Sequence, residues 1–522
     1  MNQKTIKYIP QLGDVFFGLL FIFCLGWAIH FFGYGWNSPI GTGSHSFRQT
    51  QTALSTYFLT QGGPWFAYET PVLGPPWSIP MEFPLYQWMV AALHYISGYP
   101  LGTSGRLVSV LMFFTSLIFF YQILKIIGFS AKTRLLLVSL LLVTPIYQFY
   151  SWSFMIESTA LALCLAYAWA SIQWLQKEEK KWAFLSLAFG ILAALVKITT
   201  FFGFNIFLSF FVMHKFLHES NKWEKKTIFK YLNYGTILAL IPLLSLSLWV
   251  AWSDFLKEQN PLAQGFITSD ALKTWNFGTL ESKLTWSSWD RILNGHLALG
   301  VGKLSTILPF LFFGLFNKTR FLQILSCLFV WLLVPALFTN LYVVHDYYAY
   351  ANSIFLILAI GLSLSVLLER AHWIPQLTGV LSSIFLVAHL NNIYHSGYKK
   401  GQLAFRGDLL HISKAFADPQ NNFKKGVLIV WGADWSPEIA FRSLRRVIMD
   451  RSDRPLKDKD FLKSIQLAGG KEAIAGLVFC RDKPETFVND RLHYFGMTEE
   501  KPIQLGLCRY FMKKNIEPPI SS

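Results

Sequence analysis

The chain has 522 residues, of which 53% are hydrophobic and only 15% are charged. Soluble globular domains carry about 25% charged residues, so this composition excludes an ordinary soluble protein and indicates a polytopic membrane protein. Phe (48 residues) and Trp (19 residues) are abundant, as is typical of chains whose aromatic rings lie at membrane interfaces. The net charge of +16 is typical of nucleic-acid binders as well, but here we interpret it mostly as a signal of membrane topology.

Apolar segments follow one another along residues 1–395, each near the roughly 20 residues that a helix needs to cross a bilayer. About eleven spans are expected, at 14–33, 106–127, 134–150, 154–175, 183–196, 199–217, 231–252, 297–316, 321–339, 349–368 and 375–394. Lys4 and Lys7 precede the first span, and no small-residue cleavage site follows it. We therefore expect a retained first helix and not a removed signal peptide.

Lys and Arg gather before the first span and in the loops after spans two, four, six, eight and ten. If the spans alternate in direction, all these loops lie on one side, and an excess of basic residues marks the cytoplasmic side. An odd number of spans then places the C-terminus on the outer face. The long loops 34–105 and 253–296 also fall on the outer face, and segments 48–61 and 84–98 of the first loop predict helices lying in the membrane interface.

Residues 396–522 hold 22 of the 46 Lys and Arg and 15 of the 30 Asp and Glu, which is about half of the charges in a quarter of the length. We therefore predict two domains: a membrane-embedded domain of residues 1–395 and a soluble α/β domain of residues 396–522 on the outer, periplasmic face. A helix is expected at 436–446, with Ser436 as N-cap and Pro437 in the first position. Apolar runs predict strands at 426–432, 474–480 and 505–514.

Two further features of this domain leave alternatives open. Cys480 and Cys508 either pair, which an outer location would permit, or remain free thiols, whereas the other three cysteines lie in apolar runs and are expected to be packing residues. The segment "WGADWSP" (431–437) joins the first strand to the helix. It is compatible with an anion site at a helix N-terminus, but an ordinary strand-to-helix turn is favoured.

Ionisable residues within or beside membrane spans are costly and tend to be functional. Five segments bring such residues toward the expected outer face: His45 and Arg48 in the first loop, Glu82 in "SIPMEFPLYQW", Glu157 at the start of span four, Lys197 between spans five and six, and His345 with Asp346 between spans nine and ten. Taken alone, Lys197 is equally compatible with a snorkelling side chain, and Glu82 with an acid at a helix start. Both signs of charge at one depth favour a site in which carboxylates accept a proton from a hydroxyl and cations hold a phosphate leaving group.

The order and spacing of these residues resemble the membrane-embedded glycosyltransferases of the C-type fold, over roughly residues 10–395. Among them, the protein O-mannosyltransferases and the lipid A aminoarabinose transferase are the most similar. Four segments carry the resemblance. "EFPLYQW" stands in the place of the family's Glu-x-Pro segment, and "MIEST" in the place of an acid at the start of span four. "ALVKITT" resembles the segment with the family's Lys in the turn between spans five and six, and "HDYY" resembles a motif in a late outer loop. The sequence departs from the family in two places. Its first loop begins "SHSFRQTQT", without the Asp or Asp-Glu pair usual there, and Phe83 stands where the bacterial lipid-modifying branch has Lys.

The resemblance implies an inverting hexosyl- or pentosyltransferase that moves a sugar from a polyprenyl-phosphate donor to an acceptor on the outer face of a bacterial inner membrane. The expected partners are this donor, a lipid, glycan or protein acceptor, and membrane lipids, but no nucleic acid. Nothing in residues 1–395 resembles the Asp-x-Asp motif of metal-using nucleotide-sugar enzymes, so neither a metal nor a cofactor is expected. The expected site consists of Glu82, Glu157 or His45 as catalytic residues, Arg48, Lys197, His345 and Arg291 as ligands of the donor phosphate, and Asp346 with Tyr347 beside them.

Two other functions remain open from the sequence. A transporter or flippase for a lipid-linked saccharide would need polar residues throughout the membrane and often has repeated halves, and neither is found here. A catalytically inactive binding relative is the other alternative, and the missing acid in the first outer loop favours it.

Overall fold

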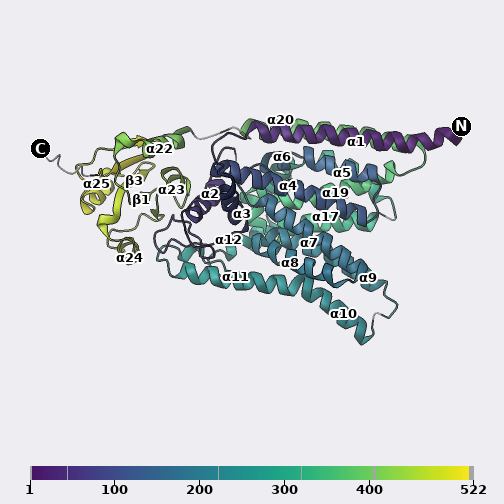
Figure 1. The fold of residues 1–522 in the computed structure, drawn as a ribbon, viewed down its shortest axis with the longest axis horizontal. Coiled ribbons are helices and arrows are strands. Elements are labelled where there is room, and N and C mark those ends of the chain that lie inside the picture. The colour runs from purple at the N-terminus through teal and green to yellow at the C-terminus, as the bar shows by residue number, and fades with distance from the viewer. Residues whose placement is uncertain are drawn as a thin grey trace. The chain divides into compact units, whose positions relative to one another are not determined.

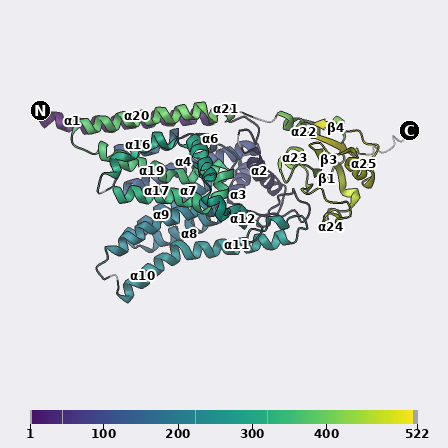
Figure 2. The same ribbon diagram turned by 180° about the vertical axis from the view of Figure 1, so that it is seen from behind.

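The computed structural model describes residues 3–43, 45–221, 223–318, 320–402, 404 and 407–515, and Figures 1 and 2 show the fold from opposite sides. The chain forms two compact units. The first consists of Met1–Ser38, Arg106–Trp249 and Lys273–Leu403, and the second of Pro39–Gly105, Val250–Leu272 and Ala404–Ser522. The first outer loop therefore folds together with the C-terminal residues, and the expected division at residue 395 between embedded and soluble parts stays a prediction.

The first unit is helical. Its longer helices are α1 (Gln3–Tyr34), α4 (Leu101–Ile126), α5 (Ala131–Val143), α7 (Glu157–Lys177), α8 (Lys180–Val196), α9 (Ile198–Leu217), α10 (Lys225–Gly235), α11 (Ile241–Glu258), α16 (Leu304–Leu315), α17 (Phe321–Leu337), α19 (Ala349–Leu368) and α20 (Trp373–Ser396). Shorter helices are α6 (Pro145–Tyr150), α12 (Lys273–Phe277), α13 (Leu280–Leu284), α14 (Trp286–Asp290), α15 (Ala298–Gly300), α18 (Thr339–Val344) and α21 (Tyr398–Gln402). Of these, α4 and α11 continue into the second unit.

Within the described residues, seven helices are long and apolar enough to cross a membrane, or eight if one bent pair forms a single span. They correspond to the segments expected as spans at 14–33, 106–127, 154–175, 199–217, 231–252, 349–368 and 375–394. The multi-pass helical class is thereby confirmed, and the count of about eleven spans stays a prediction.

Two segments expected as single spans are broken, which corrects the sequence interpretation. The segment 134–150 divides at Pro145, which opens α6 after α5 has ended at Val143. Proline lacks the backbone N–H that would continue the helix, but it fits the first turn of a new one. The segment 297–316 divides as well, because the helices Trp286–Gly300 and Leu304–Leu315 meet at 80°.

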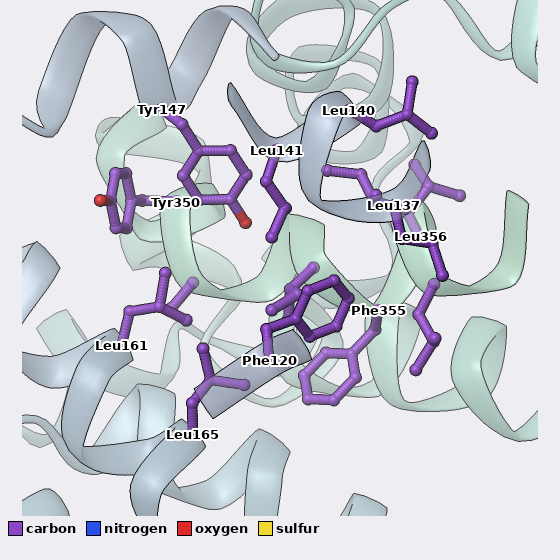
Figure 3. Close-up of a cluster of buried hydrophobic side chains, with 14 of the residues drawn as sticks. Phe120, Leu137, Leu140, Leu141, Tyr147, Leu161, Leu165, Tyr350, Phe355 and Leu356 are labelled. Carbon is purple, nitrogen blue, oxygen red and sulfur yellow. The ribbon is translucent and has the colours of Figure 1, made fainter. Parts of the chain in front are cut away.

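The core of the first unit surrounds α19, and 89% of its most apolar stretch is buried. Figure 3 shows side chains of α4, α5, α6 and α7 meeting those of α19, among them Leu137, Tyr147 and Tyr350. The rings of Tyr147 and Tyr350 meet edge to face, with their centroids 4.8 Å apart. A Cβ at Gly361 would lie 2.1 Å from the side chain of Leu137, so glycine permits this close approach of α5 and α19.

Several loops that the sequence assigns to the cytoplasmic side contact one another in this unit. The carboxylate of Glu178, after α7, lies 2.6 Å from the Nζ atoms of both Lys215 and Lys230, which come from α9 and α10. Hydrogen bonds to these two lysines lower the pKa of Glu178 to about 2. Arg320, before α17, lies 3.5 Å from Glu369, after α19. Ion pairs thus join the loop after α7 to α9 and α10, and the loop before α17 to the loop after α19. Such contacts are expected of loops that lie on the same side of a membrane.

The second unit contains a five-stranded sheet in the order β2-β1-β3-β5-β4. β1 pairs in parallel with β2 and β3, while β5 is antiparallel to β3 and β4. The strands are β1 (Val427–Trp431), β2 (Val447–Asp450), β3 (Ile474–Cys480), β4 (Ile503–Leu505) and β5 (Cys508–Met512). The helices are α2 (Ser46–Thr60), α3 (Leu85–Ser97), α22 (Gly407–Ala417), α23 (Glu438–Ser443), α24 (Lys459–Leu467) and α25 (Glu485–Tyr494).

The α/β fold predicted within residues 396–522 is confirmed in its main elements. The strands expected at 426–432, 474–480 and 505–514 correspond to β1, β3 and β5, and the helices expected at 48–61 and 84–98 correspond to α2 and α3. The sequence analysis missed β2, which has only four residues. The helix expected at 436–446 was too long, because α23 ends at Ser443 and Leu444 turns into the left-handed region with φ 52°. Pro437, not Ser436, occupies the N-cap position of this six-residue helix, which leaves an ordinary turn in "WGADWSP".

The first outer loop adds a further stretch to the sheet, beside β2. The amide of Val447 donates to the carbonyl of Pro71 over 3.0 Å, the amide of Met449 donates to that of Val72 over 3.0 Å, and Gly74 donates back to Val447 over 3.1 Å. These bonds cover an edge strand whose backbone groups would otherwise lack partners. They explain why the loop and the C-terminal residues fold as one unit.

Cys480 and Cys508 face each other on β3 and β5 and form a disulfide, which resolves the open alternative. Cys24, Cys164 and Cys327 are buried and free, as expected for packing residues.

Replacing both Cys480 and Cys508 with alanine is expected to lower the free energy of unfolding of the second unit by about 3.5 kcal/mol, because the bridge closes a loop of 28 residues in the unfolded chain. The measurement is limited proteolysis of the purified full chain over a denaturant series. A reducing agent should destabilise the wild type and leave the double variant unchanged. Thiols at both positions that react with an alkylating reagent before reduction would contradict the pairing.

Candidate functional site

Lys197 lies in the turn between α8 and α9, where an extended residue (φ −160°, ψ 98°) reverses the chain. Its side chain is only 7% exposed and forms an ion pair with Glu157, the first residue of α7, which is 1% exposed. A snorkelling side chain would reach solvent, so that interpretation of Lys197 was wrong. A buried ion pair stabilises little overall, because desolvation offsets the attraction, so the pair of Glu157 and Lys197 is a candidate functional site.

Aromatic rings surround the ammonium group of Lys197. Its Nζ atom lies 4.5 Å from the ring centroid of Tyr348 and 5.2 Å from that of Tyr347. The imidazole of His345 stacks on Tyr347, with ring centroids 5.0 Å apart and planes inclined by 23°. Cation–π contacts of this kind hold a positive charge where water is scarce. We call Glu157, Lys197, His345, Tyr347 and Tyr348 the Lys197 cluster.

Asp346 anchors the turn that carries the aromatic residues of the Lys197 cluster. Its two carboxylate oxygens accept hydrogen bonds from the phenols of Tyr150 on α6 and Tyr398 on α21, each 2.7 Å long. Hydrogen bonds to a charged acceptor are stronger than neutral ones, so this carboxylate fixes the turn between α18 and α19. The geometry suits Asp346 to positioning its neighbours and not to taking a proton.

One hydrogen-bond acceptor in the Lys197 cluster has no donor in the described parts of the chain. Within the described residues, Oε1 of Glu157 is buried and has no hydrogen-bond partner, although Oε2 meets Lys197. A small cavity beside the cluster, lined in part by His296, His345 and Asp346, has a volume of about 20 Å³. That volume is enough for roughly one water molecule.

The second unit holds another pair of opposite charges. Arg48, in the first turn of α2, forms an ion pair with Glu82 and donates to Oε1 of Gln51 over 2.8 Å. The exposed fractions of the side chains are 15% for Arg48 and 32% for Glu82, so Glu82 is the more accessible of the two candidate catalytic glutamates. This Arg48–Glu82 pair comes from two segments of the first outer loop.

Backbone hydrogen bonds hold the segment that carries Glu82. The phenol of Tyr68 accepts from the amide of Met81 over 2.7 Å and donates to the carbonyl of Glu82 over 3.0 Å. Ser253 donates to the carbonyl of Pro80 over 2.6 Å. Burial and the charge of Glu82 both raise the pKa of Tyr68, so this phenol remains a neutral donor. The carboxylate of Glu82 is therefore carried on a fixed backbone.

The structure brings together most, but not all, of the expected site residues. Glu157, Lys197, His345 and Tyr347 share the Lys197 cluster, with Asp346 supporting it, and Arg48 pairs with Glu82. His45 directly precedes α2 in the left-handed conformation, with φ 57°. Arg291 is exposed and forms no ion pair with any described residue, so it joins neither group.

Sequence reasoning missed three tyrosines and an arginine. Tyr348 was visible in "HDYY", but Tyr150 and Tyr398 lie 196 and 52 residues from Asp346, and no local pattern links them to it. Arg106 is 3% exposed, donates to the carbonyl of Trp36 and lies 5.1 Å from the ring centroid of Trp152. A buried charge near the start of a span was itself a signal that could have identified Arg106.

In the parts of the chain that the structure describes, no three His, Cys, Asp or Glu side chains form a group that could hold a metal ion. Metal independence stays a prediction.

The helical unit with its buried charged cluster, joined to an α/β unit, defines a membrane protein with the fold of the C-type membrane glycosyltransferases, which confirms the resemblance at the level of the fold. In addition, residues 78–249 match the family model of dolichyl-phosphate-mannose-protein mannosyltransferases, and this segment contains Glu82, Glu157 and Lys197.

Solved structures support the fold across nearly the whole chain. ArnT from Cupriavidus metallidurans bound to undecaprenyl phosphate matches with a TM-score of 0.58 and 10% identity, covering 94% of this chain and 97% of ArnT. The oligosaccharyltransferase AglB from Archaeoglobus fulgidus, in complex with an inhibitory peptide and a dolichol-phosphate, matches with a TM-score of 0.56 and 12% identity, covering 91% of this chain and 69% of AglB. No curated protein sequence gives a significant match.

Proposed function

We propose that this chain is a membrane glycosyltransferase that moves a sugar from a polyprenyl-phosphate donor to an acceptor on the outer face of a bacterial inner membrane. The observation that carries the proposal is the buried ion pair of Glu157 and Lys197 beneath Tyr347 and Tyr348. The fold and the partial family match support the same reaction class. The matched structures of ArnT and AglB are bound to undecaprenyl phosphate and a dolichol-phosphate, and lipid phosphates of this kind are the donor carriers that we propose here.

In this proposal, the Lys197 cluster binds the donor phosphate. The ammonium group of Lys197 donates to phosphate oxygens, and His345, on the same aromatic wall, supplies a second donor. Negative charge grows on the phosphate as the bond to the sugar breaks, so a fixed cation in a site of low dielectric constant stabilises the transition state more than the ground state. Glu157 holds Lys197 in place when no phosphate is bound.

Glu82 is the proposed base, because it is a third exposed whereas Glu157 is buried. The hydroxyl oxygen of the acceptor attacks the anomeric carbon and forms the new glycosidic bond. The bond from this carbon to the phosphate oxygen breaks, its electron pair leaves with the phosphate, and the hydroxyl proton passes to the Glu82 carboxylate. A single displacement of this kind inverts the configuration of the anomeric carbon. Arg48, paired with Glu82, holds the carboxylate in position.

The proposed topology has a cytoplasmic N-terminus and a periplasmic second unit. The disulfide between Cys480 and Cys508 supports it, because such bonds persist in oxidising compartments. The basic loops joined by Glu178 and Glu369 support it as well, since positive loops mark the cytoplasmic side. Helices α2 and α3 are proposed to lie at the outer membrane interface.

The test is sugar transfer by the purified full chain, given a panel of polyprenyl-phosphate sugars and a membrane extract as the acceptor. Transfer from one donor, with inverted configuration in the product by NMR, is the expected result. Movement of a donor between the leaflets of proteoliposomes, without transfer, would instead identify a transporter. Donor binding without transfer or movement would identify an inactive relative.

A further inference from the structure

A cavity of about 350 Å³ opens in the second unit, at the edge of the sheet where the parallel strands β1 and β2 end. In open α/β sheets, ligands bind preferentially outside the carboxyl ends of parallel strands. The volume lies at the lower end of the range for small-molecule pockets, which begins at about 300 Å³. The cavity is lined by Leu262, Gln264, Gly265, Asp434, Met449, Asp450, Arg451, Ser452 and Arg454.

Asp450, the last residue of β2, shapes the floor of this cavity. It is 2% exposed, and its carboxylate accepts from Nε1 of Trp431 over 3.0 Å and from the amides of Ser452 and Arg454 over 3.2 and 2.7 Å. Because Asp450 is satisfied by these donors, it acts as a scaffold. It holds the turn that presents Arg451, Ser452 and Arg454 to the cavity.

Two arginines offer donors at the wall of the cavity. Nε of Arg451 donates to Asp434 over 2.5 Å, and its guanidinium lies 5.0 Å from the ring centroid of Phe266. Among the described residues, Nη1 of Arg454 is buried without a hydrogen-bond partner, although a carboxylate oxygen of Asp458 lies 3.7 Å away. Asp434 is exposed and adds acceptor oxygens.

The backbone at this edge is strained. Asp434, Asp453 and Arg481 follow β1, β2 and β3, and all three have positive φ angles, of 54°, 50° and 61°. Residues other than glycine adopt this conformation at a cost, and they gather where a site needs a particular geometry. In addition, Gly432 must be glycine, because a Cβ there would lie 2.1 Å from the carbonyl oxygen of Cys480.

We propose that this cavity binds a saccharide, and that the saccharide belongs to the acceptor. The two arginines and the two aspartates balance in charge, which favours a neutral ligand over an anion or a cation. Guanidinium, carboxylate, hydroxyl and amide groups together supply the donors and acceptors that a polyhydroxyl ligand needs. The identity of the ligand as acceptor rests on the proposed transfer reaction, whereas the binding of a saccharide does not.

The test is direct binding to the purified full chain in lipid nanodiscs, measured by saturation-transfer NMR and titration. The probes are neutral oligosaccharides released from bacterial envelope polysaccharides, with uronic-acid oligosaccharides and inorganic phosphate as comparisons. The variants are Arg454→Gln, which removes a charged donor, and Gly265→Phe, which places a side chain at the mouth of the cavity. A Cβ at Gly265 would meet only Nη1 of Arg451, at 3.8 Å, so a side chain can begin at this position without a backbone clash.

A neutral oligosaccharide should bind the wild type. Arg454→Gln should weaken this binding about tenfold or more, since hydrogen bonds from charged groups are worth this much, and Gly265→Phe should weaken it as well by filling part of the cavity. Arg509→Gln is the matched control, because Arg509 also lies beside a carboxylate, that of Glu485 at 2.6 Å, but does not line the cavity. Tighter binding of phosphate than of any neutral saccharide, equal binding by all variants, or no saccharide binding would each overturn the proposal. If saccharides bind and no sugar is transferred, the proposed function fails while this site stands.

Discussion

Replacing Lys197 with alanine is expected to reduce sugar transfer by a factor of 100 or more. Lys197 supplies the buried cation of the Lys197 cluster, and the loss of one fixed group that stabilises transition-state charge costs roughly 100- to 1000-fold in rate. The substitution also leaves Glu157 as an unpaired buried charge, and breaking a buried pair in this way destabilises a protein by about 3–5 kcal/mol. Activity and stability are therefore both expected to fall.

A double variant separates these two losses. Glu157→Gln combined with Lys197→Met removes both charges and nearly preserves the volumes, and replacing a whole buried pair by uncharged groups is often neutral or stabilising. We expect the double variant to recover the thermal stability of the wild type while remaining inactive. Glu157→Gln alone removes the carboxylate partner but leaves the lysine itself, so this variant should retain part of the activity.

The measurements are thermal unfolding and initial transfer rates for the wild type, both single variants and the double variant in one detergent. Retention of the wild-type rate in the double variant would show that the pair is structural, and the donor phosphate would then have to bind elsewhere. The contacts of Tyr347 and Tyr348 with the ammonium would in that case serve only to hold α9 against the turn before α19.

The helical class and much of the sheet were predictable, because they depend on local composition. Apolar runs of about 20 residues predicted the long helices, and shorter apolar runs predicted the strands β1, β3 and β5. The errors came from single residues and from context. Pro145 divides a run that is uniformly apolar, and β2 is too short to be recognised without its neighbour β1.

The individual residues of the candidate site could be predicted from the sequence, but the contacts between them could not. A charge in an apolar context is expensive wherever it lies, so Glu157 and Lys197 could be identified from the sequence alone. Their pairing could not be predicted, because they are 40 residues apart and meet only when α7 packs against α8 and α9. The same reason hid the bonds of Asp346 to Tyr150 and Tyr398.

The pairing of residues 71–74 with β2 was the least predictable feature. It joins positions about 375 residues apart, and neither partner has the length or alternation of a confident strand. Arg446 strengthens it by binding Glu69 through two nitrogens, with the shortest contact 2.8 Å. Since the first loop carries both Arg48 and Glu82, the sheet fixes one end of the segment that leads to the proposed base.

Replacing Glu82 with glutamine is expected to lower transfer by a factor of about 100 to 10,000, the range that general base catalysis contributes. Glutamine keeps the shape of the side chain and can still accept a hydrogen bond from Arg48, but it cannot take the proton of the acceptor hydroxyl. Binding of the donor should remain unchanged, because the phosphate is proposed to bind at Lys197. Since Glu82 is a third exposed, the loss of its ion pair with Arg48 should change the free energy of unfolding by less than about 1 kcal/mol.

Glu69→Gln is the matched control for Glu82→Gln. Glu69 lies in the same loop and is also paired with an arginine, Arg446, but it has no role in the proposed reaction. The decisive measurement compares the two variants for transfer and for donor binding. Glu82→Gln should lose transfer and keep donor binding, whereas Glu69→Gln should keep both. Equal activity of the two variants would reject Glu82 as the base and move that role to Glu157, whose Oε1 atom has no donor among the described residues.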